Sequence, residues 1–183
     1  MRSAALIVVA FTLQAGTALG QVESGPEAGT APKSFKTFVV VGERPENSVD
    51  FIAERAEKST IYLFIPAGKW SRPVARFVKK LDEALEKGVE GEAEAVSIAV
   101  WVTPEPASSK EYLPRAQQSL MFNKTTLSVF EGNAFGPEGW SLNDSADVTA
   151  VVVKRGKVVK SLGLISANET VVKDVLDVLT AKK

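Results

Sequence analysis

Apolar residues recur along this chain with two different spacings, and their alternation predicts a protein built of strands and helices in turn. Short runs rich in β-branched and aromatic residues predict strands, at residues 35–41, 60–65, 95–102 and 126–130. Segments with apolar residues three or four positions apart predict amphipathic helices, at residues 47–56, 72–87, 108–120 and from 166 onward.

Two further apolar runs, at residues 148–154 and 157–162, are separated by Arg155-Gly156 and predict a β-hairpin. The last helix is expected to begin with a capping box, because Ser166 is followed three positions later by Glu169. Strands that alternate with helices form mainly parallel sheets with helices on both faces. We therefore predict one α/β/α sandwich domain, whose mixed central sheet closes with the hairpin and the C-terminal helix.

Residues 1–20 have the pattern of a secretion signal. Arg2 gives a positive start, residues 4–13 are apolar, and Ala18-Leu19-Gly20 supplies small residues before Gln21. This pattern predicts a signal peptide cleaved after Gly20, and the alternative is an uncleaved N-terminal anchor. We expect an exported protein, periplasmic or secreted, with no membrane attachment once the signal is removed.

Residues 21–34 are rich in Gly, Pro, Ser and Glu and show no apolar period. This composition predicts a flexible leader. The folded domain is then expected to occupy residues 35–183.

The composition of the chain excludes several kinds of binding and active site. The chain has 22 basic and 22 acidic residues, so it has no net field to attract nucleic acid. It contains no cysteine and no histidine. Disulfides, thiolate nucleophiles, imidazole metal sites and Ser-His pairs are therefore excluded, and we expect neither a cofactor nor a metal.

The element order and the sequence Trp70-Ser71-Arg72-Pro73-Val74, between a strand and a helix, resemble the thioredoxin-like superfamily. Thioredoxins carry Trp-Cys-Gly-Pro-Cys there, so the tryptophan and proline match while Ser71 and Val74 replace both cysteines. Alignment to redoxins with a single Cys-Pro sets Arg72 against the cysteine instead. Neither register leaves a thiol.

A second landmark of the superfamily is a cis-proline followed by threonine before the first hairpin strand. Asp147-Val148-Thr149 stands at that place, so the threonine matches and the proline does not. The additional strand at residues 126–130 and the long loop after it are more similar to the redoxin and peroxiredoxin branch. The resemblance thus implies a degenerate member that lacks the active-site cysteines.

From this resemblance we expect a redox-inactive module that binds an extracytoplasmic protein or peptide. Trp70, Pro73 and Val148 would present the groove, with Arg72 adding hydrogen-bond donors. The plainer interpretation is that Trp70 packs, Arg72 is solvated and Ser71 caps the helix by accepting a backbone N–H. Rival functions are an enzyme with a non-thiol site, at Ser71 or a carboxylate pair, and a structural or assembly component.

Other polar features carry weaker signals. The glycine-rich loop at residues 131–142 lacks the ending of a phosphate-binding loop. The oxygen-rich group Asn143, Asp144, Ser145 and Asp147 lacks the spacing of a calcium loop, so a polar turn is favoured. Sequons at Asn123, Asn143 and Asn168 matter only in a host that glycosylates exported proteins.

Overall fold

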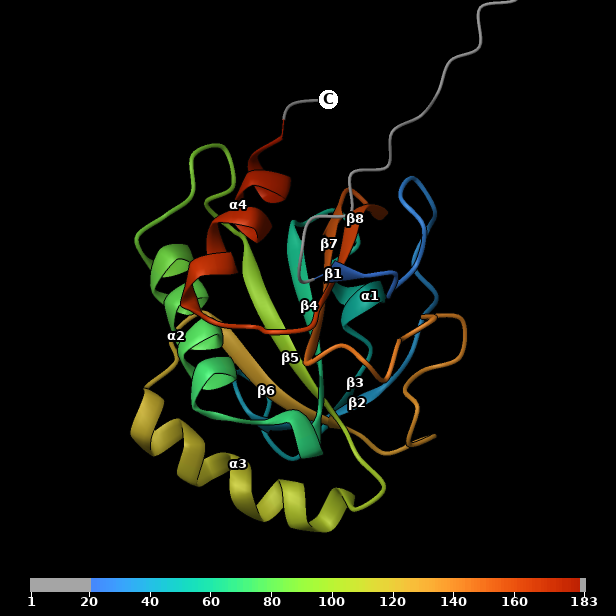
Figure 1. The fold of residues 1–183 in the computed structure, drawn as a ribbon, viewed down its shortest axis with the longest axis vertical. Coiled ribbons are helices and arrows are strands. Elements are labelled where there is room, and N and C mark those ends of the chain that lie inside the picture. Colours follow the sequence, from blue (N-terminus) through green and yellow to red (C-terminus); the bar gives the residue numbers. More distant parts are fainter. Residues whose placement is uncertain (1–20, 182–183) are drawn as a thin grey trace, which may run out of the picture.

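The protein folds around one mixed sheet, and its computed structural model describes residues 21–181. The sheet has eight strands in the order β1-β8-β7-β4-β5-β6-β2-β3 (Figure 1). The strands are β1 Gln21–Val22, β2 Thr37–Val41, β3 Ser48–Val49, β4 Thr60–Pro66, β5 Val96–Val102, β6 Thr125–Phe130, β7 Val148–Lys154 and β8 Lys157–Leu164. The α-helices are α1 Phe51–Glu54, α2 Arg72–Glu86, α3 Pro106–Leu120 and α4 Val172–Thr180, and 3-10 turns occupy Ala67–Lys69 and Glu169–Val171.

Only the centre of the sheet is parallel, which corrects the expectation of a mainly parallel sheet. Strands β4, β5 and β6 pair in parallel, whereas β7 and β8 form the expected antiparallel hairpin beside β4. Strand β2 runs antiparallel to β6, with Phe38 opposite Val129. It was expected to be a parallel strand followed by a helical crossover.

The helix expected at residues 47–56 is a single turn, and Asp50 explains why. Its carboxylate accepts hydrogen bonds from the amides of Ile52 and Ala53, at 3.0 and 3.2 Å, which fixes the helix start at Phe51. The preceding residues form β3, which pairs with β2. The chain therefore turns back on itself here, where a parallel connection would need a crossover of a dozen or more residues.

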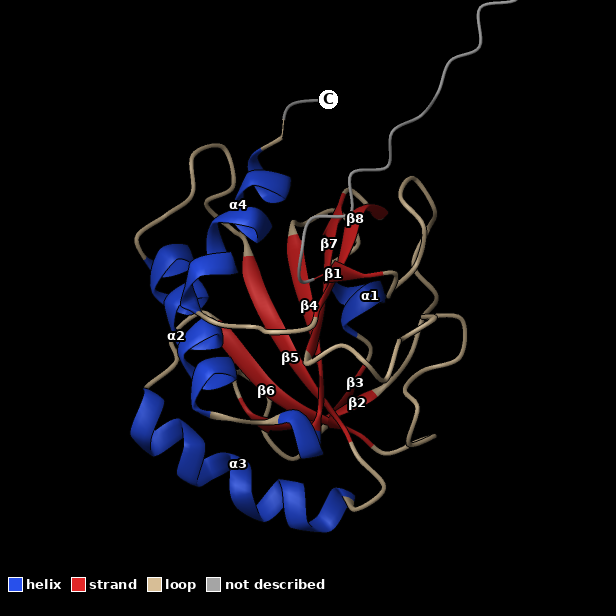
Figure 2. Ribbon diagram, in the orientation of Figure 1, coloured by secondary structure: helices blue, strands red, loops and turns tan. Residues whose placement is uncertain are grey.

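The two faces of the sheet are covered differently (Figure 2). Helices α2, α3 and α4 cover one face, where Ile61, Leu63 and Ile65 of β4 meet Phe77 and other apolar helix residues. The opposite face carries α1 and long loops. A buried cluster rich in aromatic side chains packs between the sheet and these segments. The one-turn helix α1 and the loops thus form the second outer layer of the expected sandwich.

Trp140 is the centre of that aromatic cluster. It is fully buried, and its ring centroid lies 4.8 Å from that of Phe64 and 5.1 Å from that of Phe35. The indole N–H donates to the carbonyl of Lys33 at 3.0 Å. Because its indole N–H is hydrogen-bonded, this loop tryptophan can be fully buried, and it covers the part of the sheet that a helix would otherwise cover.

Residues 21–34 pack against the domain, so the flexible leader expected from composition is corrected. Gln21 and Val22 pair with Leu164 and Gly163 of β8. A Cβ atom on Gly163 would lie 2.4 Å from the carbonyl oxygen of Val22, so the missing side chain is what admits β1. The folded part of the described chain therefore includes residues 21–34.

The start of the last helix also differs from expectation. Asn168, not Ser166, caps the turn, because its side-chain oxygen accepts from the amide of Thr170 at 2.9 Å. A 3-10 turn precedes α4, which begins at Val172. The expected signal peptide lies outside the described residues, and within residues 21–181 no helix has the length and apolar character needed to cross a membrane.

Candidate functional site

Residues 70–74 lie at the start of α2, the location expected for the degenerate reactive loop. Strand β4 ends at Pro66, the 3-10 turn Ala67–Lys69 follows, and α2 begins at Arg72. Arg72 and Pro73 are exposed in the first helical turn, whereas Val74 is fully buried in the core beneath α2. The structure therefore presents the front of the loop to solvent and uses its last residue for packing.

Trp70 is fastened to the body of the protein. Its ring centroid lies 4.8 Å from that of Trp101 on β5. Its indole N–H donates to the hydroxyl of Tyr112 on α3, at 2.8 Å. Trp70 is half-buried, so its main contribution is to hold the loop against β5 and α3.

Ser71 occupies the N-cap position of α2 but does not cap the helix with its side chain. Its backbone is extended, with φ −148° and ψ 169°, and its hydroxyl makes no capping hydrogen bond. The expected side-chain cap is therefore wrong, although Pro73 does lie in the first turn, where a missing N–H costs nothing. Within residues 21–181 no basic side chain hydrogen-bonds to the Ser71 hydroxyl, so the structure shows no nucleophile–base pair here.

A hollow of about 400 Å³ opens beside Ser71 and Pro73. Asp147 and the segment 166–170 form its other side. Two ion pairs cross its rim: Lys69 Nζ lies 3.6 Å from Asp147 Oδ1, and Arg76 Nη1 lies 3.4 Å from Glu169 Oε1. The loop is thus tied by charge to Asp147, the residue before Val148, which stands where the superfamily has its cis-proline. Residues 21–181 contain no cis peptide bond.

Val148 and Thr149 do not join this surface. Val148 is fully buried on the side of the sheet covered by α2 and α4, so its expected contact with a bound peptide is wrong. Thr149 points to the opposite face, where it is also buried and its hydroxyl lies 2.5 Å from that of Ser24. The exposed candidates that remain together are Ser71, Arg72 and Pro73.

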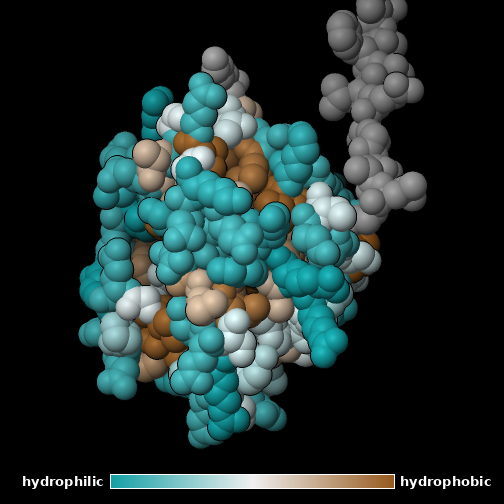
Figure 3. Space-filling model, turned by 90° about the vertical axis from the view of Figure 1, so that its left-hand side faces the viewer, coloured by the Kyte–Doolittle hydropathy of each residue, from teal (hydrophilic) through white to brown (hydrophobic). Residues whose placement is uncertain are grey.

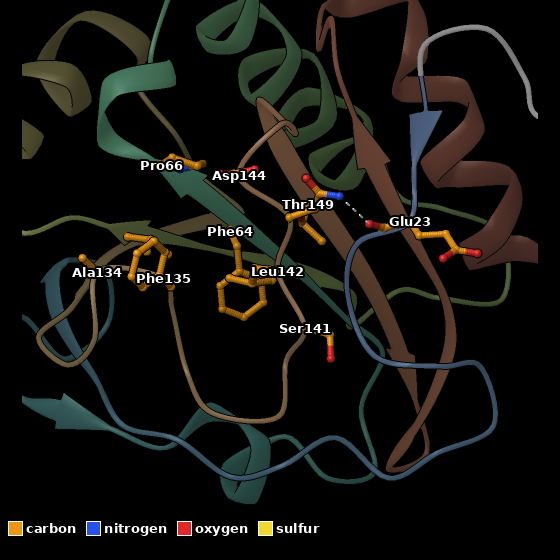
Figure 4. A pocket seen from close by; sticks show the side chains of 11 residues that line it. Glu23, Phe64, Pro66, Ala134, Phe135, Ser141, Leu142, Asp144 and Thr149 are labelled. Carbon is orange, nitrogen blue, oxygen red and sulfur yellow. Dashed lines mark hydrogen bonds between the residues drawn. The ribbon is translucent and has the colours of Figure 1, made fainter.

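Sequence reasoning missed a larger pocket on the opposite face of the sheet, with a volume of about 760 Å³ (Figure 4). Phe64, Val102 and Leu142 give it an apolar floor, and Phe135 stands at its rim. Phe64 was visible only as part of an apolar strand and Phe135 only as part of a glycine-rich loop. No sequence signal brings these two residues together.

In a chain without cysteine and histidine, carboxylates are the charged side chains left to hold a metal ion. Residues 21–181 contain no group of three or more acidic side chains close enough to hold an ion. The oxygen-rich turn around Asn143 serves the fold, since its side-chain oxygen accepts from the amide of Ser145 and its amide donates to the carbonyl of Glu23.

Comparisons with known proteins agree on the fold. No family model matches the sequence, and no curated protein matches it. The peroxidoxin BcpB from Mycobacterium tuberculosis is similar in structure with a TM-score of 0.63 and 12% identity, over 86% of this chain and 99% of that one. BsSco, of the Sco family of cytochrome c oxidase assembly proteins, is similar with a TM-score of 0.55 and 15% identity, over 87% of this chain and 100% of that one.

A Chlorobium tepidum protein, provisionally named thiol:disulfide interchange protein DsbE, gives a TM-score of 0.59 and 13% identity, over 84% of this chain and 99% of that one. These neighbours and the mixed sheet identify a thioredoxin-like fold, as the resemblance implied. Since the chain has no cysteine, it has this fold without a thiol.

Proposed function

We propose that this protein is an exported, redox-inactive module that binds an extracytoplasmic protein or peptide at the start of α2. The observation that carries the proposal is the exposed turn Ser71, Arg72 and Pro73 beside an open hollow, in a fold from which every sulfur nucleophile is gone. Thiol–disulfide exchange needs a thiolate, and a serine hydroxyl cannot form a disulfide. The exposed turn at the start of α2 is what remains for binding.

Polar contacts are the natural basis of binding at this surface. Over α2, α3 and α4, hydrophobic surface is broken into separate small areas by hydrophilic residues (Figure 3). The hollow is instead rimmed by charges of both signs, in pairs that are partly exposed. Such pairs contribute about 0–1 kcal/mol each, so a partner with its own charged groups can replace them at little cost.

Arg72 is the side chain best placed to contact a partner. It is exposed at the first position of α2, and no carboxylate among residues 21–181 forms an ion pair with it. A guanidinium presents five donors in a planar fork that suits carboxylates and backbone carbonyls. Arg72 therefore supports recognition of an acidic or extended segment.

Export rests on the pattern of residues 1–20, and the position of the first strand is compatible with it. Gln21 is paired with Leu164, so cleavage after Gly20 would leave the whole sheet intact. Without cysteine, the fold would not depend on the redox state of the compartment that receives it.

The test is capture of partners from an extract of the periplasm or medium of the producing organism, followed by comparison of two charge-reversed variants. Arg72→Glu removes the proposed contact, and Arg115→Glu is the matched control because Arg115 is exposed on α3. We expect a specific partner with the wild type and with Arg115→Glu, and its loss with Arg72→Glu. Capture of no specific partner, or equal loss in both variants, would contradict the proposal.

A conservative substitution of Trp70 tests whether the indole itself contacts the partner. Trp70→Phe keeps a ring against Trp101 and removes only the donor to Tyr112. If the partner contacts Arg72 and Pro73, Trp70→Phe should weaken capture much less than Arg72→Glu does. The reverse order would place the contact on the indole and not on the guanidinium.

A further inference from the structure

A second pocket lies on the loop-covered face of the sheet, on the side away from the start of α2. Phe64 and Thr149 come from adjacent strands β4 and β7 and point away from α2, into the opposite side of the sheet. The pocket and the hollow beside Ser71 share no lining residue. Whatever occupies the pocket therefore binds separately from the partner proposed above.

The floor of the pocket is apolar and well packed. Phe64 is 1% exposed and Val102 is 6% exposed, so their positions are fixed by the core. Phe135 at the rim is 78% exposed, which is unusual for a phenylalanine. Phe64 and Val102 therefore offer almost no surface of their own, and the accessible apolar lining lies at Leu142 and Phe135. An apolar group bound against Leu142 would cover the Phe135 ring and remove its surface from water.

The charged residues that line the pocket are both acidic. Glu23 and Asp144 line the pocket, and none of its lining residues is basic. Neither carboxylate belongs to an ion pair within residues 21–181. The side-chain amide of Asn143, next to Asp144, donates to the main-chain carbonyl of Glu23 at 3.1 Å (the dashed line in Figure 4), so the backbone segments that carry the two acidic residues are joined at the pocket.

We propose that this pocket binds a small amphiphilic cation, with its apolar part against Leu142 and Phe135 and its cationic group at the rim that carries Glu23 and Asp144. The volume of about 760 Å³ falls within the range of roughly 300–1,000 Å³ that small-molecule sites occupy. In Figure 4, Phe135 lies at one side of the pocket and Glu23 at the other, with Phe64 and Leu142 between them. An elongated ligand with one charged end matches this arrangement.

The test uses three probes with the same tail and different head groups: octyltrimethylammonium, octyl glucoside and octyl sulfate. Binding to the purified protein is measured by calorimetry at low ionic strength, below the concentration at which each probe forms micelles. We expect the cation to bind with a Kd on the order of 0.1–1 mM, as its size allows. Octyl glucoside should bind several-fold more weakly, and octyl sulfate should show the weakest binding.

Exposed residues supply variants that leave the fold intact. Glu23→Gln with Asp144→Asn removes the rim charge, and exposed pairs of this kind lead us to expect about a 2- to 10-fold loss of affinity for the cation. Glu57→Gln with Glu90→Gln removes the same charge from exposed positions elsewhere and should change nothing. Phe135→Ala should weaken all three probes, whereas Met121→Ala, at another exposed apolar residue, should not.

Each outcome decides the matter. Selective binding of the cation that depends on Glu23, Asp144 and Phe135 supports the proposal, and Arg72→Glu should leave it unchanged. Equal binding of the sulfate and the ammonium probe would overturn the charge argument. Binding that the two control variants weaken as much as the rim variants, or no binding at millimolar probe, would overturn the site itself.

Discussion

The hydroxyl of Ser24 lies 2.5 Å from the hydroxyl of Thr149, and this contact joins the N-terminal segment to the first strand of the hairpin. Ser24 also accepts a hydrogen bond from the amide of Asn143 at 2.9 Å. Both Ser24 and Thr149 are buried. One small side chain thus connects the segment of residues 21–34, strand β7 and the loop that covers the aromatic cluster.

Replacement of Ser24 should therefore destabilise the whole domain. Ser24→Ala leaves the Asn143 amide and the Thr149 hydroxyl without their partner, and an unsatisfied buried group costs about 1–3 kcal/mol. We expect a loss of that size in the free energy of unfolding, measured in urea. Ser145→Ala, at an exposed position nearby, should change it by less than about 0.5 kcal/mol, and equal losses in the two variants would contradict this account.

Asp82 of α2 is a buried carboxylate with a structural task. It is fully buried and accepts hydrogen bonds from the backbone amides of Asn123 and Lys124, at 3.1 and 2.7 Å. Asp82→Ala leaves these two amides unpaired below the start of β6, and we expect a loss of about 3 kcal/mol in the free energy of unfolding.

The neighbouring residue provides the control for Asp82. Glu83 forms only a partly exposed pair with Lys80, at 3.4 Å, so Glu83→Ala should cost no more than about 0.5 kcal/mol. If Asp82→Ala is as mild as Glu83→Ala, the carboxylate does not hold the turn before β6.

Glu92 should make stability depend on acid pH. Burial raises the pKa of Glu92, but hydrogen bonds from Lys154 and Ser59 outweigh this effect and hold the pKa below its ordinary value. A lowered folded pKa contributes stability above the unfolded pKa of about 4.3, and that stability is lost as pH falls through the folded value. Wild type should therefore exceed Glu92→Gln in unfolding free energy near pH 7, and the gap should close as pH falls below about 4.

The pH dependence has a matched control in Glu90. This residue is exposed and forms no ion pair within the described part of the chain. Glu90→Gln should track the wild type over the same pH range. A gap for Glu92→Gln that stays constant with pH would show that the pair acts through packing and not through charge.

Two substitutions should restore thiol chemistry to the loop. Ser71→Cys with Val74→Cys places thiols three residues apart at a helix start, a spacing at which side chains are neighbours. We expect this variant to form an intramolecular disulfide and to reduce a disulfide substrate, with the pKa of the thiol at position 71 below the usual value of about 8.5. Ser71→Cys alone should show the shifted pKa and no reductase turnover.

Failure of the double variant to form a disulfide would show that the loop has lost the shape as well as the sulfur. Mass spectrometry after mild oxidation distinguishes the two cases, since formation of a disulfide removes two hydrogen atoms from the reduced protein, with the oxidant taking the two electrons.

Much of the fold could be predicted from local patterns. The buried strands β4, β5 and β7 are runs of β-branched and aromatic residues, and α2 shows a clear apolar stripe, so both types of element follow from their own sequence. The hairpin at Arg155-Gly156 follows from its turn. The residues that define each of these elements lie close together in the sequence, so a local pattern is enough to predict the element.

The misses depend on contacts between residues far apart. Gln21 can pair with Leu164 because Gly163 has no side chain to block the approach of β1. The Gly- and Pro-rich composition of residues 21–34 does not predict this partner. Val148 is buried because β7 lies between β4 and β8, so its role could not be inferred from the motif position. The pocket between Phe64 and Phe135 has the same origin, since it combines a strand and a loop that only the fold brings together.

The two-residue strands β1 and β3 have a consequence for the behaviour of the protein in solution. They form the two outer margins of the sheet, so a second molecule would meet only a very short row of free backbone groups at either margin. Long open margins promote pairing of one sheet with another and hence aggregation. Strand β1 covers only Gly163 and Leu164 of β8, and Gly29 and Thr30 bond to the backbone of Val158 farther along the same strand. Removal of residues 21–30 would free both parts of β8, so the trimmed protein should aggregate more readily than the wild type.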